Sequence, residues 1–464
     1  MAEDSTLFSG WGRTQPSAGH QAVARDVAGV EDAVRAAGSR GVLVRGLGRA
    51  YGDAAQNGGG TVLSLRGDLA GGPSPVGSIR LDAARGEVTA WGGASLDEVM
   101  RQIVPRGFFV PVTPGTRHVT VGGAFAADIH GKNHHVDGSF ANHVTSLRLV
   151  LADGTSRTVS PETDHATFWA TAGGMGLTGV VTECTFRALP IETSRILVDT
   201  ERTRDLDDVL ARMTDGDERY RYSVAWIDLL ARGSRLGRSV MTRGDHAPAA
   251  TLAGRAARDP LGFAPKSLAD VPPVVPRGLL NHASVRAFNE SWYRKAPKLR
   301  IGQVVPISRF FHPLDAVHHW NRLYGRGGFL QYQFVVPFGA EATLRQVVEE
   351  MVRFGVPSFL AVLKRFGDGN PGPLPFPMPG WTLALDVPAG LDGLGGLLRR
   401  LDERVLAAGG RHYLAKDAHI GPGEVKSGYP RLSEWIAVRE SLDPEGVWQS
   451  DLGRRLDLCG TRRS

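Results

Sequence analysis

The stretch Gly115–His135, GTRHVTVGGAFAADIHGKNHH, joins a run of small residues to a polar end. Gly122, Gly123 and the alanines after them leave the backbone open, so that a flat ligand can lie directly against it. Close packing between elements is the alternative explanation for small residues alone. The stretch ends, however, in His130 and Lys132, whose donors suit the polar edge of an aromatic ligand. The combination favours a ligand site.

Metal binding is the other function suggested by the histidines of this stretch. They are not accompanied by an acidic residue at the helical spacing that metal-binding pairs use, so no metal is expected. Cys184 and Cys459 are the two cysteines of the chain, which argues against a disulfide framework or a structural zinc site.

The bulk composition describes an ordinary globular protein of more than one domain. Its 464 residues exceed the roughly 250–300 that one core supports. The formal charge of +6 without a long basic block argues against nucleic acid as a partner. Neither a signal peptide nor an apolar run of about 18 residues is visible. We therefore expect a cytoplasmic protein, or one that is peripheral at the plasma membrane.

Local patterns predict an α+β architecture. Val27–Ala37 has helical periodicity, Ser95 and Glu98 suit a capping box, and Asp153-Gly154 marks a hairpin. After about residue 190, strands such as Phe329–Pro337 alternate with amphipathic helices, which predicts an antiparallel or mixed sheet with helices on one face. The segment of about 232–286 is rich in Arg, Ala, Pro and Gly and is predicted to be a long, mobile excursion.

Two more glycine clusters accompany the first stretch. Gly46–Gly52, GLGRAYG, is followed by another turn and a strand rather than by a helix, so a Rossmann site is excluded. Its backbone N–H groups could still cradle a diphosphate, and a plain set of turns is the equal alternative for this loop alone. Gly173–Gly179, GGMGLTG, is a third turn that exposes its backbone. Three such clusters in one region favour a bound cofactor.

These motifs together resemble the vanillyl-alcohol-oxidase (PCMH-type) flavoproteins, and within them the decaprenylphosphoryl-β-D-ribose 2-oxidase family. GWGRTQPS, WYRK, FLQYQFVVP, FPMPGW and SDLGRRL carry the narrower resemblance, which runs from about Gly10 to Leu458. It implies a two-domain α+β fold, in which an FAD-binding domain stands beside a substrate (cap) domain built on an antiparallel sheet. The implied boundaries are 1–190 for the FAD-binding domain, 191–408 for the substrate domain with its mobile segment of about 232–286, and 409–464 for a C-terminal return to the first domain.

The resemblance also implies a site for FAD. Arg49-Ala50-Tyr51 stands where many relatives of the wider class carry a histidine bonded to the flavin, so non-covalent FAD is expected. The implied cofactor-binding residues are Val44, Arg45, Gly46, Leu47, Gly48, Arg49, Ala50, Tyr51, Gly52, Asp53, Ala54, Gly115, Thr120, Val121, Gly122, Gly123, His130, Gly131, Lys132, Asn133, Val181 and Tyr413.

The activity implied is oxidation of the ribose 2-hydroxyl of a polyprenylphosphoryl-β-D-ribose to the 2-keto sugar. In the family, this oxidation is the first half of epimerisation to the arabinose donor for the cell-wall arabinan of actinobacteria. Lys416 and His130 are the expected catalytic residues, with Lys416 acting either as a base or as an electrostatic stabiliser. The expected substrate-binding residues are Trp226, Gln331, Gln333, Lys364, Thr382 and Ala384. Well-known members carry cysteine in place of Ala384 and asparagine in place of Thr382.

The implied partners are the lipid substrate, an NAD-dependent reductase that completes epimerisation, and the membrane as a peripheral contact. Two other functions fit parts of the pattern. The first is an FAD-dependent alditol or aldonolactone oxidase, whose members usually carry the histidine missing here. The second is a non-catalytic protein that binds flavin or a lipid phosphate, against which Lys416 and the glutamine pair argue.

Overall fold

The computed structural model describes residues 5–460, except 67–71, 76 and 277. The outermost residues of the two predicted FAD-binding segments, 1–4 and 461–464, therefore lie outside the described residues, as does Arg277 of the predicted excursion. In the described part of the chain, no helix is both long and apolar enough to cross a membrane.

The N-terminal lobe contains two sheets. A four-stranded sheet has the order β1-β2-β4-β3, with parallel pairing of β4 to β2 and to β3. An antiparallel sheet has the order β5-β6-β10-β8-β9, and its β8–β9 hairpin turns at the predicted Asp153-Gly154. The strands are β1 Ser5–Phe8, β2 Ser17–Val23, β3 Val42–Val44, β4 Thr61–Ser64, β5 Ile79–Asp82, β6 Glu87–Trp91, β8 Val144–Val150, β9 Ser156–Val159 and β10 Val180–Arg187.

Short helices join and cover these strands. The predicted capping box begins α2, because the Glu98 amide donates to Ser95 Oγ and the Ser95 amide donates to the Glu98 carboxylate. The helices of this lobe are α1 Val27–Arg35, α2 Leu96–Ile103, α3 Val121–Ala126, α4 His134–Asp137 and α5 His165–Thr171, and the strand pair β7 Phe108–Phe109 and β11 Leu189–Pro190 leads out of it.

The second part of the molecule is built on one eight-stranded antiparallel sheet with the order β16-β12-β14-β13-β19-β20-β18-β21. The predicted strands at Phe329–Pro337 and Trp381–Pro388 are β18 and β20, at its centre. The strands are β12 Arg195–Thr203, β13 Tyr222–Ile227, β14 Ser239–His246, β16 Leu299–Pro306, β18 Phe329–Pro337, β19 Ala361–Phe366, β20 Gly380–Pro388 and β21 Arg411–His412.

Helices cover one face of this sheet. Leu344 and Val347 on α10 and Leu397 and Leu401 on α11 are fully or almost fully buried in one core with alternate residues of the strands, such as Tyr332. Because strand residues alternate between faces, the neighbours of those core residues point to the other face, which carries the cavity described below. The helices of this part are α6 Leu206–Gly216, α7 Gly254–Arg258, α8 His282–Lys295, α9 Ile307–Phe311, α10 Glu341–Phe354 and α11 Leu394–Ala407. The predicted α+β fold with a separate antiparallel sheet is confirmed.

The excursion predicted for about 232–286 is wrong over its first part. Residues Ser239–His246 form β14, which pairs with β12 and β13 inside the large sheet. The strand is hard to recognise in the sequence because it contains Arg243, a residue type that is usually exposed. In the structure its guanidinium is buried, lies over the Tyr220 ring and donates to a backbone carbonyl. The rest of the segment holds α7 and the two-residue strand β15 Ala269–Asp270, which pairs with β17 Val317–His318.

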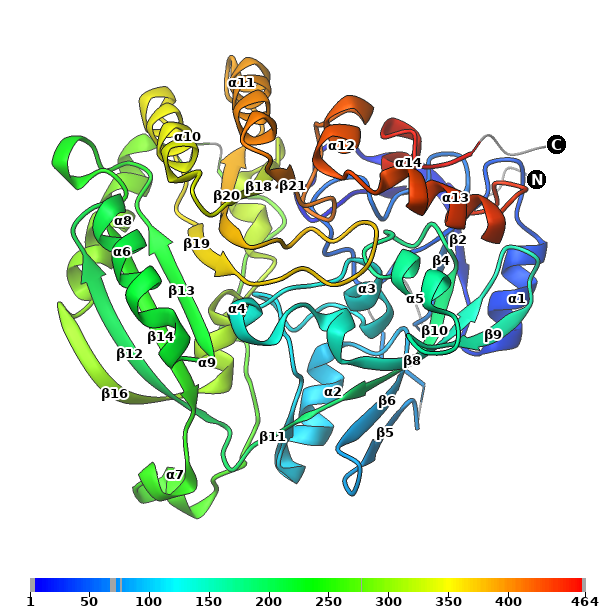
Figure 1. The fold of residues 1–464 in the computed structure, drawn as a ribbon, viewed down its shortest axis with the longest axis horizontal. Coiled ribbons are helices and arrows are strands. Elements are labelled where there is room, and N and C mark those ends of the chain that lie inside the picture. The colour runs from blue at the N-terminus through cyan, green and yellow to red at the C-terminus, as the bar shows by residue number, and fades with distance from the viewer. Residues whose placement is uncertain (1–4, 67–71, 76, 277, 461–464) are drawn as a thin grey trace.

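The end of the chain returns to the N-terminal lobe (Figure 1), where α12 Pro422–Gly428, α13 Leu432–Leu442 and α14 Asp451–Arg455 lie beside the first strands. Trp448 bridges to Val42 in β3, and Arg455 forms an ion pair with Asp53. The loop between β21 and α12 therefore passes from the edge of the large sheet to the N-terminal lobe, and it carries Lys416.

Candidate active site

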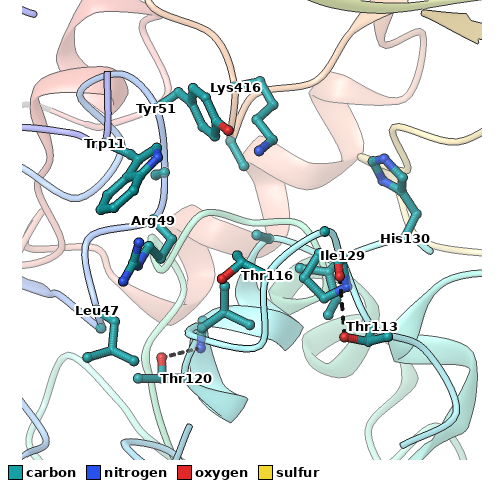
Figure 2. Close-up of a pocket in the computed structure, with 18 of the residues that line it drawn as sticks. Trp11, Leu47, Arg49, Tyr51, Thr113, Thr116, Thr120, Ile129, His130 and Lys416 are labelled. Carbon is teal, nitrogen blue, oxygen red and sulfur yellow. Dashed lines mark hydrogen bonds between the residues drawn. The ribbon is translucent and has the colours of Figure 1, made fainter. Parts of the chain in front are cut away.

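A cavity of 470 Å³ lies between the N-terminal lobe and the face of the large sheet that α10 and α11 do not cover. Figure 2 shows Lys416 and Tyr51 side by side, with Trp11, Arg49 and Leu47 on the Tyr51 side of the cavity and His130 on the Lys416 side. The sheet lines it with side chains two residues apart, as alternation requires. These are Val224 and Trp226, Val240 and Thr242, Val362 and Lys364, and Gln331 and Gln333, with Ala384 beside Gln333.

Most of the residues predicted from the sequence line this one cavity. They are Val44, Arg45, Gly46, Leu47, Gly48, Arg49, Ala50, Tyr51, Ala54, Gly115, Thr120, Gly122, Gly123, His130, Gly131, Lys132, Val181, Trp226, Gln331, Gln333, Lys364, Ala384, Tyr413 and Lys416.

Five predicted residues lie behind the wall instead. Gly52 packs against the Asp417 carbonyl, and Asp53 pairs with Arg455. Val121 is buried in the core of the lobe, and Asn133 donates to the Pro111 carbonyl. Thr382 donates to the Phe334 carbonyl beneath Gln333. They support the lining residues rather than face the cavity.

The loop 46–50 lines the cavity with consecutive residues whose backbone amides are not used within the described part of the protein. Among the described residues, the backbone amides of positions 46 to 50 donate no hydrogen bond to the protein. Gly48 has φ +63°, and a Cβ at Gly46 would collide with the Thr120 side chain. A run of free amides at a cavity wall is a cradle for an anion such as a diphosphate.

The small residues of the opening stretch form a second part of the wall. Gly122 packs so closely that an added Cβ would lie 3.1 Å from the carbonyl oxygens of both Gly92 and Val181. Gly115 has no atom within 4 Å of such a Cβ and borders open space. Helix α3 begins here, with Thr120 Oγ1 accepting from the Gly123 amide at 3.2 Å. This backbone surface suits a flat ligand.

The histidines of the stretch point in different directions. His130 lines the cavity, His134 Nδ1 accepts from the Gly367 amide, and His135 Nε2 lies 2.9 Å from the Tyr220 carbonyl oxygen. They do not converge on a common point, so the structure gives them separate roles.

His130 is neutral and has one free nitrogen. Burial, with Lys364, His134 and Lys416 adding to it, holds the pKa of His130 well below its usual value. Gln333 Nε2 lies 2.9 Å from His130 Nε2, and an amide nitrogen can only donate. The ring proton is therefore on Nδ1, which has no partner among the described residues. A ligand in the cavity can accept from this N–H.

Lys416 is held without a direct ion pair. Its Nζ lies over the Tyr51 ring, 3.8 Å from the centre, and no described carboxylate is within ion-pair distance. Burial lowers the pKa of Lys416 to about 7, although Asp386 opposes this shift. Lys416 can therefore release or accept a proton near neutral pH.

Asp386 is the buried carboxyl beside this lysine. Gln331 Nε2 donates to it at 2.6 Å, and the Tyr324 hydroxyl donates at 3.4 Å. Burial raises the pKa of Asp386 to about 7, against the opposing hydrogen bond from Gln331 and the charge of Lys416. The Gln331 amide nitrogen is thus turned toward Asp386, which leaves the amide oxygen of Gln331 free as an acceptor.

Two more lysines, Lys364 and Lys132, line the cavity. Burial lowers the pKa of Lys364 to about 8 and that of Lys132 to about 7, the latter with help from Lys364. Lys132 donates to the Phe310 carbonyl, whereas no ion pair of Lys364 is found among the described residues. An anionic group in the cavity would restore the charged form of these lysines.

A buried cluster behind β18 anchors the Lys416 loop. Asp402 on α11 accepts at 3.0 Å from the Tyr332 hydroxyl and from His419 Nε2, and His412 Nε2 lies 3.0 Å from the same carboxylate. Farther along the loop, Asp417 pairs with Arg455 at 2.8 Å. The loop is therefore fastened to the large sheet at one end and to the N-terminal lobe at the other.

Sequence reasoning missed Asp386, Tyr324 and Trp11 as parts of this site. Trp11 lies under the Arg49 guanidinium at 3.9 Å, and Arg49 Nε has no partner among the described residues. Asp386 carried a signal, since its position two residues after Ala384 on one strand places it on the cavity-facing side of the sheet. Trp11 and Tyr324 gave no such signal.

The comparisons with known proteins agree with this geometry. Residues 20–160 match the family model described as "FAD binding domain". The decaprenylphosphoryl-β-D-ribose oxidase of Mycolicibacterium smegmatis is 44% identical over 454 residues, 97% of each chain. An uncharacterised protein of Streptomyces coelicolor is 42% identical over 374 residues, which are 78% of this chain and all of that one. A putative D-arabinono-1,4-lactone oxidase of Neurospora crassa is 29% identical over 112 residues, or 24% of this chain and 20% of that one.

The anion cradle, the open backbone surface and the matched domain define the class: this is an FAD-binding flavoprotein of the oxidoreductase type. The similarity to the Mycolicibacterium smegmatis oxidase extends over nearly the full length and defines a narrower group within this class. The chain belongs to the decaprenylphosphoryl-β-D-ribose oxidase family.

Proposed function

We propose that the protein oxidises the 2-hydroxyl of a polyprenylphosphoryl-β-D-ribose to the 2-keto sugar. The observation that carries this proposal is the presence of two anion-binding regions in one cavity. The free amides of 46–50 suit the diphosphate of FAD, and Lys132 and Lys364 line the same cavity as a second region. A substrate that bears its own phosphate next to a sugar matches this second region.

The residues that would hold FAD follow from the geometry. The loop 44–51 would bind the diphosphate, and the backbone of Gly115, Gly122 and Gly123 would contact the flat part of the cofactor. His130 Nδ1–H would donate to its polar edge. When bound, FAD supplies the acceptor for the hydride that leaves the ribose C2. Non-covalent attachment fits the cofactor loop, which contains neither histidine nor cysteine between Val44 and Ala54.

The protein's own part in the oxidation is to remove a proton and to bind charge. As the C2–H bond breaks and the C2=O bond forms, the hydroxyl proton passes to neutral Lys416, and the resulting ammonium is stabilised by Asp386 and by the Tyr51 ring. The amide oxygens of Gln331 and Gln333 would accept hydrogen bonds from the sugar hydroxyls. Lys364 would pair with the phosphate, with Trp226 and Ala384 packed against the sugar.

The domain roles and partners complete the proposal. Residues 1–190 and 409–464 would form the FAD-binding domain, and 191–408 the substrate domain. An NAD-dependent reductase would return the 2-keto product to the alcohol of opposite configuration, which completes epimerisation to the arabinose donor for arabinan. The protein would work in the cytoplasm or peripherally at the plasma membrane, where its lipid substrate resides.

Product analysis tests this function. The FAD-loaded protein is incubated with a short-chain prenylphosphoryl ribofuranose labelled with deuterium at C2, and the product is examined by mass spectrometry. Loss of the deuterium and of one further hydrogen, with a carbonyl that borohydride reduces to ribose and arabinose, is expected. Turnover of free alditols or aldonolactones, with none of the phosphorylated sugar, would instead identify an alditol or aldonolactone oxidase.

A further inference from the structure

The surface formed by α8 and the edge strand β16 has an unusual composition. We call the exposed side chains of residues 282–304 the α8–β16 surface. It includes Trp292, Leu299 and Ile301, which are 48%, 58% and 71% exposed. Exposed apolar groups gathered in one place mark interaction sites, whereas single ones need no explanation.

These apolar side chains are not displaced members of the core. Helix α8 already buries its inner side through Val285 and Asn289, the latter bonded to Asp228. Phe288 and Trp292, one helical turn apart, stack on each other at 6.1 Å with both rings exposed. Strand β16 pairs with β12 alone, at the end of the sheet. The surface therefore lacks a partner within the described chain.

The same surface is strongly basic. Residues 282–304 contain five Arg or Lys and one acidic residue, Glu290, which pairs with Arg238 and Arg294. This single stretch accounts for most of the chain's formal charge of +6. The described structure shows no ion pair for Arg286, Lys295, Lys298 or Arg300, all of which are exposed. Exposed tryptophan and aliphatic groups among free cations are typical of surfaces that bind anionic lipid headgroups.

Trp292 connects this surface to the cavity. It is half-exposed on α8, yet it lines the same cavity as Lys364 and Lys416. The cavity and the basic apolar surface therefore meet at Trp292. A lipid whose phosphosugar head lies in the cavity would have its tail beside this surface.

From these observations, and on the basis of the proposed function, we propose that the α8–β16 surface docks the protein on an anionic lipid bilayer with the cavity mouth against the membrane. A second copy of the chain is the competing occupant of an open sheet edge. It is disfavoured because a two-fold contact would bring the free cations together. In addition, a register shift opposite Val198 to Thr200 and Gly302 at φ +70° interrupt the strand ladder.

The test is flotation of the full-length, FAD-loaded protein with vesicles of phosphatidylcholine alone or of equimolar phosphatidylcholine and phosphatidylglycerol. Binding is expected to the anionic vesicles and to fall as salt rises. The double variant Leu299→Glu/Ile301→Glu should weaken it by about tenfold or more. Leu7→Glu is a single-site control for position, because Leu7 is 72% exposed on the edge strand β1, which belongs to the N-terminal lobe at the opposite end of the molecule from β16.

The charge contribution is tested separately. Lys295→Gln/Lys298→Gln should lower binding to anionic vesicles about 25-fold, at about fivefold per basic residue. The control variant Arg399→Gln/Lys426→Gln removes the same charge from two exposed positions, one on α11 and one on α12. It should bind the vesicles as the unmodified protein does.

Three results would overturn the proposal. They are equal binding to both kinds of vesicle, full binding by Leu299→Glu/Ile301→Glu, and a dimer that this variant converts to monomer. Oxidation of a dispersed short-chain substrate, measured in parallel, should be unchanged in the surface variants. If the unmodified protein oxidises no such substrate, the proposed function fails, whereas the vesicle results still decide the docking surface.

Discussion

The Lys416 ammonium nitrogen lies 3.8 Å from the centre of the Tyr51 ring, and both residues line the same cavity. A ring face attracts the charged form of lysine without accepting a conventional hydrogen bond from it, so that the N–H groups and, after deprotonation, the lone pair stay available. Asp386, beside the pair, adds a buried carboxyl that favours the charged lysine. The arrangement holds Lys416 at a defined place and lets it change protonation state.

Replacement of Lys416 should therefore remove the proton acceptor. Lys416→Ala is expected to slow FAD reduction by the substrate about 10²- to 10⁴-fold, the usual contribution of a general base. In the unmodified protein this rate should rise with pH through about 7, where Lys416 loses its proton. Rapid-mixing absorbance measurements over a pH series report both effects. Lys426→Ala, at an exposed position of α12, serves as the control. An equally slow control, or a flat pH profile, would remove Lys416 from this role.

Asp386→Asn should lower activity while it raises stability at alkaline pH. The pKa of Asp386 is raised to about 7 in the folded state, against about 3.9 for an ordinary aspartate. The folded protein thus keeps a proton that the unfolded chain loses, and its stability falls as pH rises from about 4 to 7. Asparagine keeps the bond from Gln331 but carries no charge. Urea unfolding should show the variant about 1–3 kcal/mol more stable at about pH 8, with the difference vanishing near pH 4.

The same substitution separates the two roles of Asp386. Loss of its negative charge should lower the pKa of Lys416 further and shift the pH–rate profile toward acid, since Asp386 raises that pKa. An unshifted profile with reduced activity would limit Asp386 to orienting Gln331.

The stability that the cluster around Asp402 gives to the Lys416 loop should fall both at acid and at alkaline pH. His412 and His419 hold the pKa of Asp402 well below its usual value, a contribution present above the ordinary aspartate pKa and lost as pH falls. The hydrogen bond to Asp402 raises the pKa of His419 despite its burial, a contribution present below about 6.5 and lost as pH rises through the folded value. Asp402→Asn should cost about 3–5 kcal/mol near pH 6.

The cost of Asp402→Asn, measured by urea unfolding, should shrink toward acid and toward alkaline pH. Asp207→Asn, an exposed pair member on α6, is the control and should change stability by under about 1 kcal/mol. If the loss of stability in Asp402→Asn did not depend on pH, packing rather than charge would be what stabilises the cluster.

The cofactor should come off the protein on denaturation. The loop from Val44 to Ala54 offers no histidine or cysteine for a bond to the flavin. After acid precipitation the yellow colour is expected in the supernatant. Colour in the pellet that disappears in His130→Ala would reveal a covalent bond to the one histidine found among the residues that line the described cavity.

Sequence patterns predicted those helices and strands in which buried residues recur at the regular spacing of the element. Leu344, Val347 and Met351 on α10, and the central strands β18 and β20, were readable because one side or both sides face a core. β14 was not, since Arg243 and Gly244 break its alternation and a buried arginine is understood only through its partners. The free amides of 46–50 could be suspected from the glycines alone.

The electrostatics of the site required the fold. Asp386 and Lys416 are 30 positions apart in sequence, and they interact because β20 and the loop after β21 meet at one end of the cavity. Nothing in YLAKD shows that its lysine is buried, and a lone lysine is usually solvated. The family resemblance pointed to Lys416 as a site residue. Only the tertiary structure shows that the Tyr51 ring and the Asp386 carboxyl lie beside it and that its pKa is lowered.

The most direct test of the central claim is anaerobic. The FAD-loaded protein is mixed with a short-chain prenylphosphoryl ribofuranose, and the flavin absorbance near its visible maximum is followed. Bleaching in the unmodified protein, slowed strongly in Lys416→Ala, is the predicted result. A flavin that stays yellow with this substrate, while the protein is folded and loaded with FAD, would contradict the account.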